Sequence, residues 1–221
     1  YYGKRLLGGG HISIEGPYIM YDETSGYYYL FVSYGALTSN GGYQVRVFRS
    51  KTVDGEYVDM NGKYPEKSAQ HQNFGLKLTG NYKLPSLEKA YMATGHNSAF
   101  IDDDGRMYLV YHTRFNDNGE GHSPRVHQML VNEEGWTCEL PYQTQGETVN
   151  KDGYDTDDII GRYYVINQGT AIDSKIANPV ILYLEKNGKV KGEKSEGTWE
   201  CKDGSYYMNI TIDGKKYSGV L

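Results

Sequence analysis

The chain has 221 residues, 38% of them hydrophobic, and a formal net charge of −5 at pH 7. This length and apolar content suffice for one large domain or two smaller domains with buried cores, which excludes a disordered tail. The 23 Lys and Arg residues are scattered without forming a basic stripe, so we expect no nucleic-acid partner. No segment approaches the roughly 18 apolar residues of a membrane-spanning helix, so we expect no membrane partner.

Tyrosine is the most unusual feature of the composition, with 23 Tyr residues against 5 Phe and 2 Trp. Tyr favours half-buried strands, and it also presents a flat apolar face with a polar tip, which suits sugar rings. Composition alone leaves both interpretations open. Cys138 and Cys201 lie far apart and match no metal or redox spacing, so a disulfide and two free thiols are both compatible with the sequence.

Short segments rich in Tyr or β-branched residues, separated by Gly, Asn and Asp, predict an all-β protein built from hairpins. In chain order, the first predicted strands cover residues 17–21, 26–33 and 43–50, and the next three cover residues 98–102, 107–113 and 125–131. The two groups share their strand spacing and are separated by a long polar stretch. This repetition indicates successive blades of a β-propeller, with a β-sandwich as the alternative.

Residues 143–158 are rich in Gln, Thr, Gly, Asn and Asp and predict a linker. The strands predicted after it belong to a small antiparallel barrel or sandwich and cover residues 159–167, 179–185, 197–202, 205–212 and 215–221. We therefore assign residues 1–142 to propeller blades and residues 159–221 to a small β-domain that we expect to be incomplete. The chain starts at Tyr1 without a signal pattern and its last predicted strand runs to Leu221, so we expect a fragment or a processed chain.

Glu15 stands directly before Gly16-Pro17 and a predicted strand. A carboxylate at the entrance of a strand can face a central cleft, although an acidic residue before Gly-Pro also suits a solvated loop. The sequence has no His-x-x-x-His and no Cys-x-x-Cys spacing, so we expect no tightly bound transition metal. It also has no Gly-x-Ser-x-Gly nucleophile motif. Taken alone, the segment around Glu15 leaves a solvated loop residue and a cleft residue both open.

Several motifs in order resemble a known family. Glu15-Gly16-Pro17-Tyr18, residues 26–34 and residues 45–50 resemble a blade of the five-bladed propeller hydrolases of glycoside hydrolase family 43. Residues 95–100, 108–114 and 125–128 are similar to later blades of its arabinanase branch, and residues from 159 onward are similar to the small β-domain that follows the propeller in two-domain members. The resemblance implies a partial five-bladed propeller and an extracellular enzyme that hydrolyses α-1,5-arabinofuranosidic bonds in arabinan or arabino-oligosaccharides with inversion. Endo and exo action both stay open.

The resemblance assigns Glu15 as the general acid that protonates the departing sugar oxygen. An inverting glycosidase needs one protonated carboxyl on the leaving group and one ionised carboxylate that activates water on the opposite face. In the family, the aspartate base and a second aspartate that orients the acid come from blades preceding the glutamate. Residues 1–14 contain neither Asp nor Glu. We therefore expect the isolated chain to be inactive and to need a partner segment that supplies the remaining blades.

The resemblance also implies that His96 helps to hold a calcium ion, largely through water, because calcium prefers oxygen ligands. A hydrogen-bonded structural role for His96 is the alternative. Tyr34 and Asn97 adjoin the matched motifs, and we expect both to contact substrate in the cleft. Two other functions remain open from the sequence, namely a non-catalytic carbohydrate-binding module and a structural subunit that completes a propeller.

Overall fold

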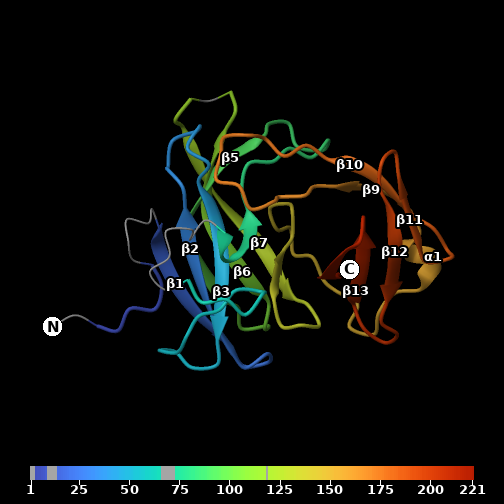
Figure 1. Cartoon of the computed structure of the whole chain (residues 1–221), viewed down its shortest axis with the longest axis horizontal. Coiled ribbons are helices and arrows are strands. Elements are labelled where there is room, and N and C mark those ends of the chain that lie inside the picture. Colours follow the sequence, from blue (N-terminus) through green and yellow to red (C-terminus); the bar gives the residue numbers. More distant parts are fainter. Residues whose placement is uncertain (1–2, 9–13, 66–72, 118) are drawn as a thin grey trace.

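The computed structural model describes residues 3–8, 14–65, 73–117 and 119–221, and nearly all regular structure in them is β-strand. The strands form two four-stranded sheets and one six-stranded sheet. Figure 1 shows the two four-stranded sheets beside each other and the six-stranded sheet, coloured orange to red, at the other end of the molecule. No helix among the described residues is long and apolar enough to cross a membrane.

The first sheet contains four strands in sequence order, β1 (Ile14–Asp22), β2 (Tyr27–Tyr34), β3 (Gln44–Ser50) and β4 (Leu76–Thr79). Asp22 closes the first hairpin, because its carboxylate accepts hydrogen bonds from the backbone N–H groups of Thr24 and Ser25 at 3.2 and 3.0 Å. An antiparallel meander of this kind is the architecture of one propeller blade.

The second sheet repeats this order with β5 (Tyr91–Ile101), β6 (Met107–Phe115), β7 (His122–Val131) and β8 (Thr137–Glu139). β5 begins seven residues earlier than residue 98, where the sequence pattern placed it. Two register shifts interrupt its pairing with β6, and Ala93 and His96 have positive φ angles of 47° and 53°. These irregularities break the two-residue alternation that identifies a strand in sequence.

The main core lies between the two blades. Residues of both sheets alternate toward it, as expected for strands with one buried face. The buried members of this core are Met20, Tyr29, Phe31, Val45, Val47, Ala99, Met107, Leu109, Tyr111, Met129 and Trp136. Two meanders sharing one core confirm the prediction of successive blades, so the all-β, partial-propeller fold is as expected.

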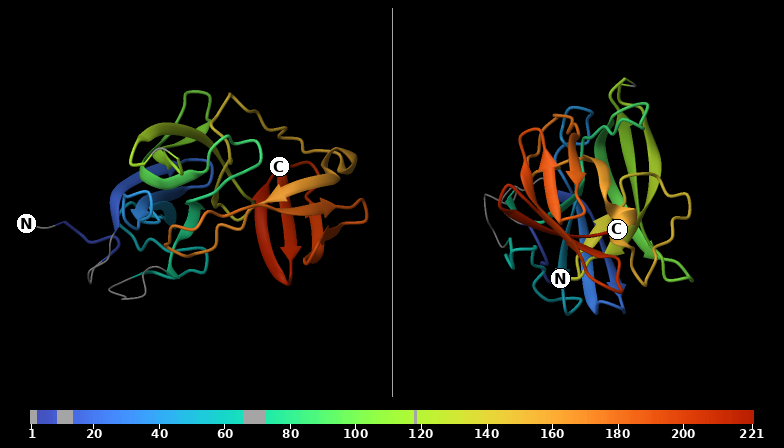
Figure 2. Two further views of the ribbon diagram at one scale, coloured as in Figure 1. Left: turned by 90° about the horizontal axis from the view of Figure 1, so that it is seen from above. Right: turned by 90° about the vertical axis from the view of Figure 1, so that its right-hand side faces the viewer.

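The C-terminal sheet is a single six-stranded meander after a one-turn helix, α1 (Thr156–Ile159). Its strands are β9 (Gly161–Val165), β10 (Val180–Leu184), β11 (Lys189–Gly192), β12 (Glu196–Cys201), β13 (Tyr207–Ile212) and β14 (Lys215–Val220). The sheet curls around its own core, as seen in Figure 2, and Trp199 is buried there with Leu182, Leu184 and Val190. Cys138 and Cys201 are free thiols.

The segment between β9 and β10, residues 166–179, fastens the C-terminal sheet to the blades. In Figure 1 this orange segment runs back from the C-terminal sheet onto the blades. The fully buried guanidinium of Arg46 donates to the carbonyls of Thr170 and Phe74 at 2.5 and 2.8 Å. Gln44 donates to the carbonyl of Ala171 at 2.9 Å. The burial of Arg46 lowers its pKa to about 10, so the side chain is still charged at neutral pH.

Gly42 marks the closest approach of this segment to the first blade. It has a φ of 68°, and a Cβ built on it would lie 2.5 Å from the backbone nitrogen of Asp173. Gly62 has nearly the same φ, 69°, but nothing lies within 4 Å of its Cβ position. The two glycines therefore separate the cost of a left-handed backbone from the cost of a steric clash.

We predict that Gly42→Ala destabilises the chain much more than Gly62→Ala. Both substitutions place a Cβ in the left-handed region, at a cost of about 1–2 kcal/mol. Only Gly42→Ala also forces Asp173 away, which adds about 1–3 kcal/mol. Since 1 kcal/mol corresponds to roughly 2–4 °C in a chain of this size, the melting temperatures should differ by several degrees in differential scanning calorimetry. Equal losses would show that residues 166–179 do not pack on Gly42.

Candidate active site

Glu15 lies on β1, the first strand of the first blade, just before a break in the pairing with β2. It pairs with Ser33, and the register then shifts between Glu15 and Tyr18. Gly16 permits this bulge, because its φ is 58°, a value that a residue with a side chain rarely adopts. The Glu15 side chain is exposed, so its carboxyl can meet a ligand.

Tyr43 holds the carboxyl of Glu15. Its hydroxyl donates a hydrogen bond of 2.7 Å to Oε1 of Glu15. Burial, reinforced by this hydrogen bond, raises the pKa of Tyr43 well above its usual value, so the phenol keeps its proton and acts as donor. Gly95 makes room for the ring, because a Cβ at that position would lie 2.3 Å from Cε1 of Tyr43.

A buried hydroxyl, that of Ser33, joins the two blades next to Glu15. The backbone N–H of His96 donates to Oγ of Ser33 at 2.7 Å, and this Oγ donates to Oδ1 of Asn97 at 3.2 Å. The Cβ position of Gly16 lies 3.5 Å from Cα of His96. The structure thus brings Glu15, His96 and Asn97 together, although they lie about 80 residues apart in sequence.

His96 and Asn97 differ in what they expose. The side chain of His96 is exposed, whereas Asn97 is buried. Nδ2 of Asn97 has no hydrogen-bond partner within the described part of the chain. This nitrogen is sealed from solvent, so the structure does not show Asn97 facing a ligand.

Tyr34 does not belong to this site, which corrects the expectation that it contacts substrate. The residue is fully buried on the opposite face of β2, because successive side chains of a strand point to opposite faces and Ser33 points to the site. Its ring lies under the guanidinium of Arg46, 4.6 Å from the ring centroid. Burial raises the pKa of Tyr34 to about 12. A buried ring offers a sugar no stacking surface.

The ring of His112 packs against the ring of Tyr43. The two rings are stacked with centroids 5.8 Å apart. Burial lowers the pKa of His112 to about 4, and the charges of His122 and Arg114 act in the same direction. The imidazole is therefore neutral at pH 7.

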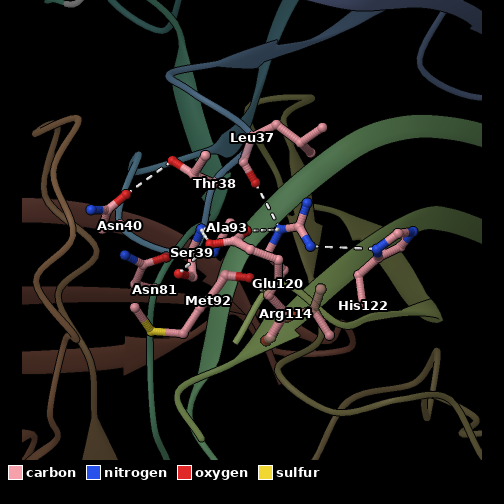
Figure 3. A network of polar contacts seen from close by, with 11 residues as sticks. Leu37, Thr38, Ser39, Asn40, Asn81, Met92, Ala93, Arg114, Glu120 and His122 are labelled. Atoms are coloured by element: carbon pink, nitrogen blue, oxygen red, sulfur yellow. Dashed lines mark hydrogen bonds and ion pairs between the residues drawn. The ribbon is translucent and has the colours of Figure 1, made fainter. Parts of the chain in front are cut away.

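A network of hydrogen bonds and an ion pair connects loops of the two blades (Figure 3). Nε of Arg114 donates to the carbonyl of Leu37 at 2.8 Å and lies 3.3 Å from the carboxylate of Glu120. Ser39 donates through both its backbone N–H and its hydroxyl to Glu120. These bonds lower the pKa of Glu120, so its carboxylate stays charged. The network links the β2–β3 loop of one blade to the β6–β7 loop of the other and so fixes the position at which β3 begins, beside Tyr43.

The part of the chain that the structure describes offers no cluster of charged side chains around His96 for a calcium ion. No three His, Cys, Asp or Glu side chains in this part gather as metal ligands. His96 offers one nitrogen, whereas calcium takes six to eight oxygens. We therefore derive no chemical step from a metal.

Tyr43 and Ser33 are the site residues that sequence reasoning missed. Both lie inside predicted strands, where they count as ordinary strand residues. The hairpin register is the signal that could have found them, because Glu15 pairs with Ser33 and Ser33 pairs with Val45, two residues from Tyr43.

The chain is similar to known proteins along its whole length. The profile of glycosyl hydrolases family 43 matches residues 5–137, and that of a C-terminal lipocalin-like domain matches residues 141–221. An extracellular endo-α-(1→5)-L-arabinanase 2 of Bacillus subtilis is 41% identical, and an extracellular endo-α-(1→5)-L-arabinanase of Thermotoga petrophila is 42% identical, each over 100% of this chain. A crystal structure of the endo-1,5-α-L-arabinanase from Thermotoga petrophila in complex with TRIS superimposes with a TM-score of 0.92 at 43% identity.

The matches cover a much larger share of this chain than of the related proteins. The chain spans 49% of each of the two curated relatives and 51% of the solved structure. The family profile nevertheless covers more than half of the chain, and it covers β1 to β7, on which the candidate site lies. On this basis the chain belongs to glycosyl hydrolases family 43.

Proposed function

We propose that this chain is part of an extracellular glycosidase that hydrolyses α-1,5-arabinofuranosidic bonds in arabinan, with Glu15 as the general acid. The observation that carries the proposal is an exposed carboxyl on the first strand of a blade, held by the phenol donor of Tyr43. The names of the two curated relatives support the substrate and the extracellular location.

In the proposed reaction the carboxyl of Glu15 gives its proton to the glycosidic oxygen as the C–O bond breaks. Water then attacks the anomeric carbon from the opposite face, and a second carboxylate accepts its proton. We propose that this base belongs to blades other than the two described here. The chain would then supply the acid alone, and arabinan incubated with the purified chain should release no reducing sugar.

We predict that Glu15→Gln lowers kcat on arabinan about 10²- to 10⁴-fold in a longer protein that joins these residues to the remaining blades, because an amide cannot replace the acid. The kcat of the same variant on dinitrophenyl arabinofuranoside should fall far less, since the leaving group of this substrate needs no protonation. Glu23→Gln, an exposed glutamate in the turn after β1, is the matched control and should leave both rates unchanged. Full arabinan cleavage by the Glu15→Gln variant would show that Glu15 is not the general acid.

Tyr43 is a positioning residue for Glu15, and we predict that Tyr43→Phe lowers kcat about 10-fold with little change in KM, since it removes one hydrogen bond to an ionisable group. Tyr57→Phe is the control, because Tyr57 is equally buried and its hydroxyl donates to the carbonyl of Val53 at 2.9 Å. Steady-state kinetics with an arabino-oligosaccharide distinguish the two. A change confined to KM would contradict the positioning role.

We propose that His96 contacts a calcium ion through water rather than directly. Its exposed imidazole leaves room for a bridging water, and no three His, Cys, Asp or Glu side chains gather as metal ligands among the described residues. Crystals of the longer protein soaked in calcium should show an anomalous peak beyond direct bonding distance from the imidazole and bridged to it by water. The absence of a peak near His96 would refute this assignment.

A further inference from the structure

Strand β5 carries a β-bulge just before it reaches the candidate active site. β5 advances three residues from Met92 to Gly95, while the partner strand β6 advances only two over the same stretch. The bulge contains Ala93, whose φ is 47°, in the left-handed region that residues with a Cβ rarely adopt. A backbone in this conformation persists only where the surrounding structure holds it.

This bulge decides which residue of β5 faces Tyr43. With the bulge, Gly95 pairs with His112, whose ring is stacked on that of Tyr43. Without the extra residue, Thr94 would take the position opposite His112. A side chain does not fit there, because even a Cβ on Gly95 would lie 2.3 Å from Cε1 of Tyr43. The bulge is therefore a condition for the position of Tyr43, whose hydroxyl holds Glu15.

Asn81 supports the bulge and ties it to the C-terminal domain. The residue is 5% exposed, and its Oδ1 accepts a hydrogen bond of 2.8 Å from the backbone N–H of Ala93 (Figure 3). Nδ2 of the same amide donates to the carbonyl of Asp173 at 3.2 Å. The backbone carbonyl of Asn81 accepts from the N–H of Ala177 at 2.9 Å. Asn81 thus connects β5 to the segment 166–179.

An amide suits both partners of this side chain. The N–H of Ala93 needs an acceptor and the carbonyl of Asp173 needs a donor, and Asn carries one of each. An ionised Asp in its place would turn a second acceptor toward the carbonyl of Asp173. A Leu of similar size would leave the N–H of Ala93 unbonded in a buried position, which is costly.

Asp173 reaches the surroundings of Tyr43 by two routes. Its carbonyl binds Asn81, and its backbone nitrogen lies 2.5 Å from where a Cβ on Gly42 would be. Gly42 directly precedes Tyr43 in the sequence. The segment from the C-terminal domain therefore supports Tyr43 both through the β2–β3 loop and through β5.

We propose that Asn81 is a positioning residue for the general acid. It holds the β5 bulge in register and so keeps Gly95 beside Tyr43, which orients the carboxyl of Glu15. Asn81 acts through β5 and Tyr43 and is not itself a catalytic residue. The assignment of the reaction rests on the proposed function.

The test uses Asn81→Ala in the longer protein that joins these residues to the remaining blades. We expect kcat on an arabino-oligosaccharide to fall about 3- to 10-fold with little change in KM, because the acid is less well oriented. The kcat on dinitrophenyl arabinofuranoside should fall far less, since that leaving group needs no acid.

Asn132→Ala is the matched control. Asn132 is also 5% exposed, its Oδ1 accepts from the N–H of Trp136 at 2.8 Å, and its Nδ2 donates to the carbonyl of Ser218 at 2.9 Å. It therefore also ties a backbone N–H of the second blade to a carbonyl of the C-terminal domain. It lies in the β7–β8 turn, at the other end of the ten-residue strand β7 from the β6–β7 loop. Both variants should lower the melting temperature by similar amounts, and only Asn81→Ala should lower kcat.

Ala93→Gly tests whether Asn81 acts through the bulge. Gly adopts a φ of 47° without steric cost, so adding Ala93→Gly to Asn81→Ala should raise kcat about 2- to 5-fold. Amide NMR of the isotopically labelled 221-residue chain gives a second readout that needs no activity. Asn81→Ala should shift the signals of Gly95 and His96 and speed their hydrogen exchange, whereas Asn132→Ala should leave them unchanged.

The outcomes separate this proposal from the proposed function. Unchanged signals at Gly95 and His96, no gain from Ala93→Gly, or equal losses of kcat in Asn81→Ala and Asn132→Ala would overturn the positioning role. Full kcat in Asn81→Ala beside a large loss in Glu15→Gln would also overturn it and leave the proposed function intact. If Glu15→Gln keeps full kcat on arabinan, the proposed function fails and the link from Asn81 to an acid fails with it. The amide signals then still decide whether Asn81 holds the bulge.

Discussion

Arg46 carries a positive charge at a position where none of its surface is exposed. A buried charge is tolerated only where acceptors compensate for the lost water. Here the compensation comes from three parts of the chain, the carbonyl of Phe74, the carbonyl of Thr170 and the side chain of Gln44, with the ring of Tyr34 below. The guanidinium therefore couples the first blade to the segment that leads into the C-terminal sheet.

Gln44 connects Arg46 to the candidate active site. Gln44, which bonds both Arg46 and the carbonyl of Ala171, directly follows Tyr43, whose hydroxyl holds Glu15. The β2–β3 loop that precedes Tyr43 is held on one side by residues 166–179 and on the other by the network around Arg114. The position of the Glu15 carboxyl thus depends on contacts from both blades and from the C-terminal domain.

This dependence suggests why the C-terminal domain accompanies the blades. One part of it, residues 166–179, packs on Gly42, next to Tyr43, whose hydroxyl bonds Glu15. Another part, β9, lines a cavity of about 570 Å³ together with residues of β4 and β8. The same domain therefore helps to position Glu15, although none of its residues belongs to the candidate active site.

The sequence by itself determined the all-β class, the two successive blades and the position of Glu15 before a Gly-Pro break, because alternation and turn residues are local signals. It did not predict β4, β8 or β11, which contain four, three and four residues and are too short to show a period. The boundaries 142 and 158 stay a prediction. Only the tertiary structure decided that Tyr43 meets Glu15, that Tyr34 points away and that Thr79, Glu139 and Gln168 share a cavity. Those relations depend on strand register and on packing between sheets, which join residues far apart in the chain and leave no local pattern.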